Sequence, residues 1–152
     1  MKKLYLLVLV NVIAFTSQAQ TVGINENKER KQGLFRQLPD TIPVELSSLQ
    51  AILRLQAGSE VVIDLSQSRQ HPIQGTVVAS SDQQNGKRRS VSVSTPKNEG
   101  AVFHISNVVL DDGKEMYRGT WMHKDYNEIF VLTHTGREYV LLKKKFKDLV
   151  ME

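Results

Sequence analysis

The chain has 152 residues, no cysteine and a formal net charge of +4. Without cysteine it has no disulfide, no thiol nucleophile, no cysteine-ligated zinc and no haem attached through thioethers. Its length suits one domain that buries a core without covalent cross-links. Composition therefore excludes several kinds of site before any motif is considered.

The first 19 residues have the pattern of a secretory signal peptide. Lys2 and Lys3 precede an apolar run over residues 4–15, and the small residues Ser17 and Ala19 suit the cleavage site. The run is shorter than the roughly 20 residues of a membrane-spanning helix, which favours cleavage after Ala19 over a retained anchor. The sequence thus predicts a secreted or periplasmic bacterial protein with no transmembrane segment after cleavage.

Removal of the signal changes the charge of the chain. Lys2 and Lys3 leave with it, so 18 basic and 16 acidic residues remain and the net charge falls to +2. A nearly neutral domain gives no general argument for nucleic-acid binding, which is disfavoured.

Residues 20–42 are expected to form a flexible N-terminal arm. The segment is polar and charged, and it lacks a hydrophobic periodicity. Leu34, Phe35 and Leu38 are candidates for docking, but they are too few to form a core of their own.

Residues 43–56 are expected to contain one short amphipathic helix. Pro43 suits its first turn and Gly58 suits its end. Leu46, Leu49, Ile52 and Leu53 fall on one helical face. An extended segment is the alternative, because Leu53 and Leu55 also fit a strand.

From Glu60 onward, short runs with alternating apolar and polar residues predict strands. Asn85-Gly86 and Asp111-Asp112-Gly113 are typical of hairpin turns. The predicted strands are residues 61–65, 73–79, 89–95, 101–109, 116–123, 128–134 and 137–144, followed by a helical turn over 146–151. Residues 43–152 are therefore predicted to be one mostly β domain, an antiparallel meander of about seven strands. We expect it to close as a barrel or a strongly curved sheet, and a sandwich is the alternative.

One strand of this meander carries an aromatic face. In residues 116–123, Tyr117, Gly119 and Trp121 share one side, and Met116 and Arg118 share the other. We expect the aromatic side to face the core, with Gly119 allowing close packing. An exposed platform for a ligand is the alternative.

Histidines and carboxylates give only weak candidates for a metal site. His123 and His134 fall on neighbouring predicted strands, where Asp125 or Glu128 would add a ligand for zinc. The spacing matches no metal motif, so unrelated surface histidines are favoured. The acidic residues around Gly113 lack EF-hand spacing and suit a turn instead.

No catalytic residue and no cofactor is predicted. The chain has no Gly-x-Ser-x-Gly elbow and no glycine-rich phosphate loop. Three basic clusters remain, at residues 28–31, 87–89 and 143–147. Lysines at strand ends often serve solubility, which is the favoured explanation. The candidate interaction surface nevertheless consists of Lys87, Arg88, Arg89, Lys143, Lys144 and Lys145.

The preferred function is a non-enzymatic binding or interaction module of the bacterial periplasm or extracellular space. Its expected partner is another secreted or envelope protein, and a polyanion or anionic surface is a second kind of partner. One alternative is a small secreted hydrolase with a carboxylate or His-metal site. The other is an inhibitor-like or pro-segment-like domain that acts on another secreted protein.

Overall fold

The computed structural model describes residues 30–65 and 72–150. The signal peptide and residues 20–29 of the expected arm lie outside these residues. Within the described part, eight antiparallel strands form one sheet in the order β1-β8-β7-β6-β5-β4-β3-β2. They are β1 (Thr41–Val44), β2 (Glu60–Asp64), β3 (Pro72–Gln83), β4 (Arg88–Thr95), β5 (Ala101–Val109), β6 (Glu115–Met122), β7 (Glu128–His134) and β8 (Tyr139–Lys145).

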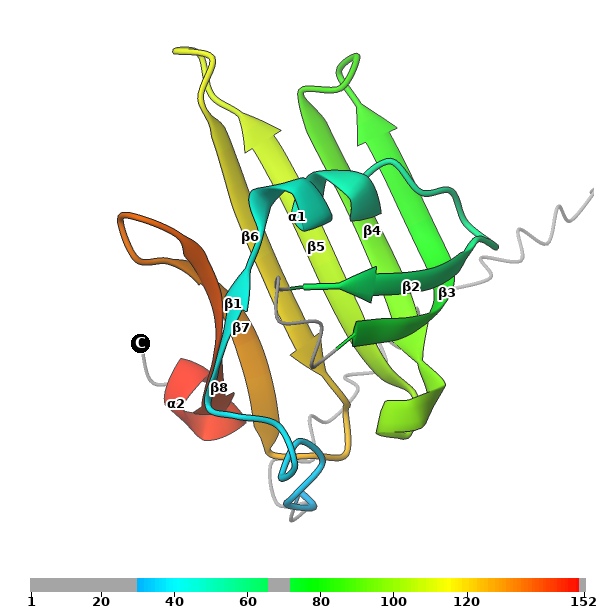
Figure 1. Cartoon of the computed structure of the whole chain (residues 1–152), viewed down its shortest axis with the longest axis vertical. Coiled ribbons are helices and arrows are strands. Elements are labelled where there is room, and N and C mark those ends of the chain that lie inside the picture. The colour runs from blue at the N-terminus through cyan, green and yellow to red at the C-terminus, as the bar shows by residue number, and fades with distance from the viewer. Residues whose placement is uncertain (1–29, 66–71, 151–152) are drawn as a thin grey trace, which may run out of the picture.

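The sheet curls into a half-barrel, as Figure 1 shows. Helix α1 (Leu46–Ile52) lies across one end of the curl, which we call the upper end. The short helices η1 (Pro96–Asn98) and α2 (Phe146–Val150) lie at the opposite, lower end. The predicted mostly β fold with a curved meander is confirmed.

The two edges of the half-barrel meet beside α1. The chain leaves one edge through β1, crosses through α1 and joins the other edge as β2. Glu45 donates its backbone N–H to the carbonyl of Leu65 at 2.8 Å. Ser48 Oγ donates to the carbonyl of Asp64, also at 2.8 Å. These two bonds stabilise the curl at the upper end.

Most predicted strands match the observed ones, with two differences. β3 extends to Gln83, because its pairing with β4 continues past a bulge between Val77 and Ala79. β1 was not predicted, and its pairing with β8 also shortens the helix expected over residues 43–56. A four-residue strand that contains Pro43 has little local signal, since its stability comes from a distant partner.

The core fills the inner face of the sheet. Tyr117 and Trp121 are buried there, which confirms the predicted orientation of β6. A Cβ on Gly119 would lie 2.8 Å from the carbonyl oxygen of His104, so only glycine permits this approach of β6 to β5. The largest fully buried side chains include Phe35, Phe103, Phe130, Leu49, Ile52, Ile73, Ile105 and Leu141.

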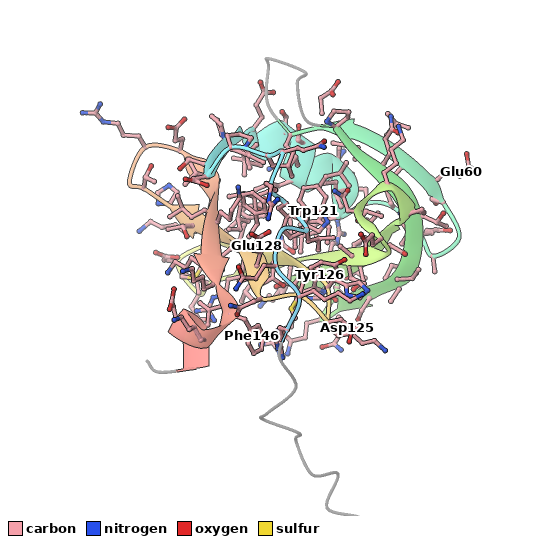
Figure 2. The ribbon with its side chains drawn as sticks, turned by 90° about the horizontal axis from the view of Figure 1, so that it is seen from below. Glu60, Trp121, Asp125, Tyr126, Glu128 and Phe146 are labelled. Atoms are coloured by element: carbon pink, nitrogen blue, oxygen red, sulfur yellow. The ribbon has the colours of Figure 1, made fainter. Side chains whose placement is uncertain are left out.

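Residues 30–40 close the lower end of the half-barrel. The ring of Phe35 lies 4.9 Å from that of Trp121 and 5.1 Å from that of Phe130 between centroids. The Phe35 backbone N–H donates to Glu128 Oε2 at 2.9 Å. Figure 2 shows this segment passing Trp121, Tyr126 and Glu128. Residues 30–42 of the expected arm are thus packed against the sheet, because Phe35 fills its core.

Candidate functional site

The structure separates the two halves of the predicted interaction surface. Lys87 ends the turn between β3 and β4, and Arg88 and Arg89 begin β4, at the upper end of the sheet. Lys143, Lys144 and Lys145 end β8 at the lower end. The six residues therefore do not form one basic patch.

Lys143 has a structural role that its sequence context did not indicate. Its Nζ donates to the carbonyl of Leu38 at 2.6 Å and lies 3.1 Å from Asp40 Oδ1. Only 16% of its side chain is exposed, and Nζ lies 5.7 Å from the centre of the Phe130 ring. Lys143 thus binds the N-terminal segment to the sheet.

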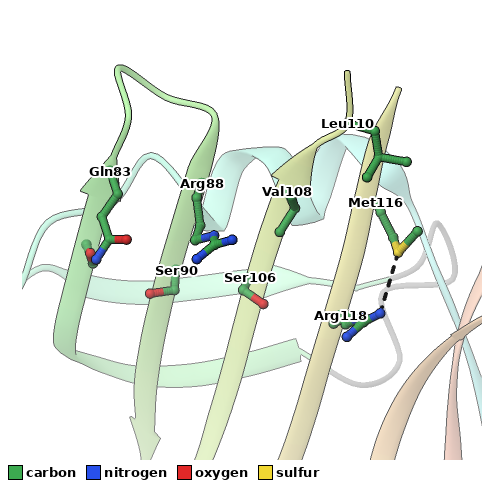
Figure 3. Close-up of a pocket in the computed structure, with 9 residues that line it drawn as sticks. Gln83, Arg88, Ser90, Ser106, Val108, Leu110, Met116 and Arg118 are labelled. Carbon is green, nitrogen blue, oxygen red and sulfur yellow. Dashed lines mark hydrogen bonds between the residues drawn. The ribbon is translucent and has the colours of Figure 1, made fainter. Parts of the chain in front are cut away.

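Arg88 lines a groove on the outer face of the sheet, which we call the outer groove. Its volume is about 450 Å³. Figure 3 shows side chains from β3, β4, β5 and β6 around it. The lining residues are Ser81, Gln83, Arg88, Ser90, Ser106, Val108, Leu110, Met116 and Arg118.

Strand register explains why these residues meet. Gln83, Arg88, Val108 and Met116 form one row across the four strands, and Ser81, Ser90, Ser106 and Arg118 form the next. Arg88 and Arg118 stand on β4 and β6, which are separated by β5 alone. Because neighbouring strands lie about 4.8 Å apart, about 10 Å of sheet separates the strands of the two arginines, with Ser90 beside Arg88 and Ser106 beside Arg118.

The charge of the outer groove is positive and uncompensated. Its lining contains two arginines and no carboxylate. Among the described residues, Arg118 has a single hydrogen-bond contact, from Nη2 to Met116 Sδ at 3.9 Å, and Arg88 forms no ion pair. Arg89, by contrast, faces the other side of the sheet and pairs with Asp82 at 2.9 Å. An anionic ligand would therefore meet free guanidinium groups in this groove.

One wall of the outer groove is apolar. Leu110 and Met116 are each 40% exposed, and Val108 lies beside them. Methionine adapts its shape to different apolar partners. The groove thus offers an apolar surface next to cationic and hydroxyl groups, which is a common composition for a binding surface.

Ser92 and His104 form a pair on the same outer face, next to the groove. Ser92 Oγ lies 3.0 Å from His104 Nδ1. Both residues lie in the middle of paired strands, where the backbone N–H groups form the hydrogen bonds of the sheet. These N–H groups are therefore not free to stabilise the oxyanion of a reaction that a catalytic serine would perform. This geometry fits a cross-strand hydrogen bond.

The structure does not bring the candidate zinc ligands together. His123 follows β6 at the lower end, and His134 ends β7 at the upper end. His123 Nδ1 accepts the backbone N–H of Asp125 at 3.1 Å, and its ring packs on Tyr126. In residues 30–65 and 72–150, no three histidine or carboxylate side chains gather around a metal-sized space.

A polar cluster at the upper end connects α1 to the sheet. Gln50 Nε2 donates to the hydroxyl of Tyr117 at 3.3 Å, and that hydroxyl donates to Glu115. The hydroxyl of Tyr139 accepts the backbone N–H of Tyr117 at 3.3 Å. Burial, together with the bond to Glu115, raises the pKa of Tyr117 to about 12.

This raised pKa predicts a loss of stability in alkali. Tyrosine in the unfolded chain has a pKa of about 10, so folding favours the neutral phenol. The contribution is fully present below about pH 10 and is lost as the pH rises toward about 12. We expect the free energy of unfolding to fall over this range, and Tyr117→Phe to reduce the slope. Denaturant unfolding measured from pH 9 to 12 checks this, and an unchanged slope in the variant would contradict it.

Arg88 belongs to a basic cluster of the sequence, whereas its counterpart Arg118 does not. No sequence motif connects the other lining residues Arg118, Ser106 and Met116. The register of β4, β5 and β6 alone brings them together with Arg88. The alternation of buried and exposed residues in β6 indicates that Arg118 lies on the outer face of the sheet, the face away from Trp121.

No helix in the described part of the chain is long and apolar enough to cross a membrane. Comparison with models of known families, with curated proteins and with solved structures finds no match to the chain.

Proposed function

We propose that this protein is an exported, non-enzymatic binding module. The outer groove is its binding surface, and its ligand is an acidic segment of another secreted or envelope protein. The signal-peptide pattern of residues 1–19 supports a site of action outside the cytoplasm.

The single observation that carries this proposal is that neither Arg88 nor Arg118 forms an ion pair with a residue that the structure describes. Arg118 ends the row of serine hydroxyls and Arg88 stands beside Ser90 in the next row, in a groove lined by no carboxylate. Guanidinium groups bind carboxylates through paired, charge-assisted hydrogen bonds. Serine hydroxyls add donors beside them. The groove is thus complementary to a chain with carboxylates on successive positions.

The apolar wall favours a peptide over a polysaccharide as the ligand. Leu110 and Met116 expose hydrocarbon that a polar sugar chain would leave unmatched. Apolar side chains beside the acidic ones would cover this wall and exclude water from the ion pairs. We therefore favour a peptide that combines acidic and apolar residues.

Neutralising both arginines is expected to weaken partner binding at least about tenfold. Each hydrogen-bonded charge contributes about 1.5–3 kcal/mol, and about 1.4 kcal/mol corresponds to a factor of ten. The test is capture of partners from the envelope and medium of the native host by the mature chain. Wild type and Arg88→Gln/Arg118→Gln would be compared by quantitative mass spectrometry.

The matched control is Lys124→Gln/Arg137→Gln, which removes the same charge from exposed positions outside the groove. This variant should retain the partners of the wild type. Equal capture by the groove variant and the wild type would contradict the proposal. Equal losses in both double variants would indicate general charge attraction and would also reject the groove as the site.

A further inference from the structure

A second concave region lies at the mouth of the half-barrel, between the end of α1 and the β3–β4 hairpin. It has an open part of about 580 Å³, which we call the mouth groove. A smaller pocket of about 70 Å³, which we call the inner pocket, continues it toward the core. Leu53, Arg54 and Arg89 line both spaces, which makes them one continuous region.

Asn107 is the buried polar group at the base of this region. It is only 6% exposed and lines the inner pocket. Its Oδ1 accepts the backbone N–H of Arg89 at 3.2 Å, which fixes the orientation of the amide. The amide nitrogen donates no hydrogen bond to any described residue. The nitrogen is not fully buried, so a ligand that enters the inner pocket can reach it, and an oxygen atom of that ligand suits this donor.

Two guanidinium groups stand at the same pocket. Arg54 forms no ion pair or hydrogen bond with a described residue through its side chain. Arg89 uses Nε for Asp82, at 2.9 Å, which leaves its terminal nitrogens available. Together with the Asn107 amide, these groups provide the donors that a carboxylate requires.

Acceptors lie beside these donors. Glu115 lines the inner pocket, and Asp82 lines the mouth groove. The region therefore differs from the outer groove, whose lining contains no carboxylate. A ligand that fits it carries a hydrogen-bond donor close to its own carboxylate. Leu53, Leu55 and Ala57 add a short apolar surface for the rest of such a molecule.

We propose that the mouth of the half-barrel is a second binding site, for a small organic acid that bears a hydroxyl or ammonium group next to its carboxylate. The carboxylate binds Arg54, Arg89 and the Asn107 amide. The hydroxyl or ammonium group donates to Glu115 or Asp82. The volume of the mouth groove is in the range of small-molecule sites, about 300–1,000 Å³. Apart from Ser81, this site and the outer groove have no lining residue in common, so either can fail alone.

The test is a titration of the isotope-labelled mature chain followed by the NMR signal of the Asn107 side-chain amide. The probes are glycolate, glycine, acetate and ethylammonium, each to tens of millimolar. We expect glycolate or glycine to shift this signal with saturation, acetate to bind at least about threefold more weakly, and ethylammonium to have no effect.

Arg54→Gln should weaken the binding of the best probe at least about fivefold. Arg54 is exposed, so this variant should keep the fold. Arg137→Gln, at an exposed position outside both grooves, is the matched control and should bind as the wild type does. The absence of any saturable shift at Asn107 overturns the proposal, because water alone then satisfies the amide. Equal affinity in Arg54→Gln and wild type overturns it as well.

Discussion

Replacing Phe35 by alanine is expected to lower the free energy of unfolding by about 3–5 kcal/mol, the usual cost of truncating a buried phenylalanine. Phe35 is 1% exposed, and its ring contacts Trp121 and Phe130. Its backbone N–H also donates to Glu128 Oε2. The variant thus removes the main contact of the N-terminal segment with the core. Urea unfolding of the mature chain, followed by Trp121 fluorescence, measures the effect.

Two further variants test whether this loss arises from packing. Phe35→Leu retains most of the buried volume and should cost clearly less than alanine. Leu46→Ala truncates a side chain that is 46% exposed and should cost less than about 1 kcal/mol. If Phe35→Ala unfolds at the same urea concentration as Leu46→Ala, the N-terminal segment is not part of the folded core.

Gly75→Ala is expected to destabilise the sheet by about 3 kcal/mol, near the upper end of the usual cost of overpacking. A Cβ at this position would lie 1.9 Å from the carbonyl oxygen of Ser94 and 2.9 Å from its carbonyl carbon. Both are backbone atoms, so β3 and β4 must move apart to accept the methyl group. Gly119→Ala should cost less, about 1–2 kcal/mol, since its closest contact is 2.8 Å.

Gly136→Ala provides the control for the backbone conformation of glycine. Gly136 has a φ of +90° in the β7–β8 turn, and a Cβ there meets no atom within 4 Å. Its replacement should cost about 1 kcal/mol through backbone strain alone. Thermal unfolding of the three alanine variants compares them directly. A Gly75→Ala protein that is as stable as Gly136→Ala would contradict the close approach of β3 and β4.

The local pattern of the sequence predicts most of the sheet. The alternation of valine and serine in β4 is enough to orient its two faces, and Asn85-Gly86 is enough to place a turn. The closure of the half-barrel has no such local signal. β1 pairs with β8, and Phe35 contacts β7, across most of the chain length. Such contacts follow from the complete fold and not from the composition of a short window.

The basic clusters show why a run of charge in sequence need not form a patch. Neighbouring residues on a strand face opposite sides of the sheet. Arg88 therefore lines the outer groove, while Arg89 pairs with Asp82 at the mouth of the half-barrel. Lys143 likewise binds the N-terminal segment from the inner face. The candidate site combines one residue of a predicted cluster with Arg118, which lies outside every cluster.

The same alternation gives the β3–β4 hairpin a part in both proposed sites. Ser81 lines the outer groove and also the mouth groove, which lie on either side of the hairpin. A ligand at one site would therefore contact a strand that also lines the other. Control variants for either site are therefore placed outside both grooves, as Lys124 and Arg137 are.

Photo-cross-linking from β6 tests the central claim, that partners bind at the outer groove, most directly. Met116 lines the groove, and Met122 lies on the same face of β6 at its lower end. Each methionine would be replaced in turn by p-benzoylphenylalanine, and the mature chain irradiated with envelope and medium of the native host. We expect a discrete cross-linked protein from position 116, absent from position 122 and lost in Arg88→Gln/Arg118→Gln. The same product from both positions, or none from position 116, would contradict the outer groove as the binding surface.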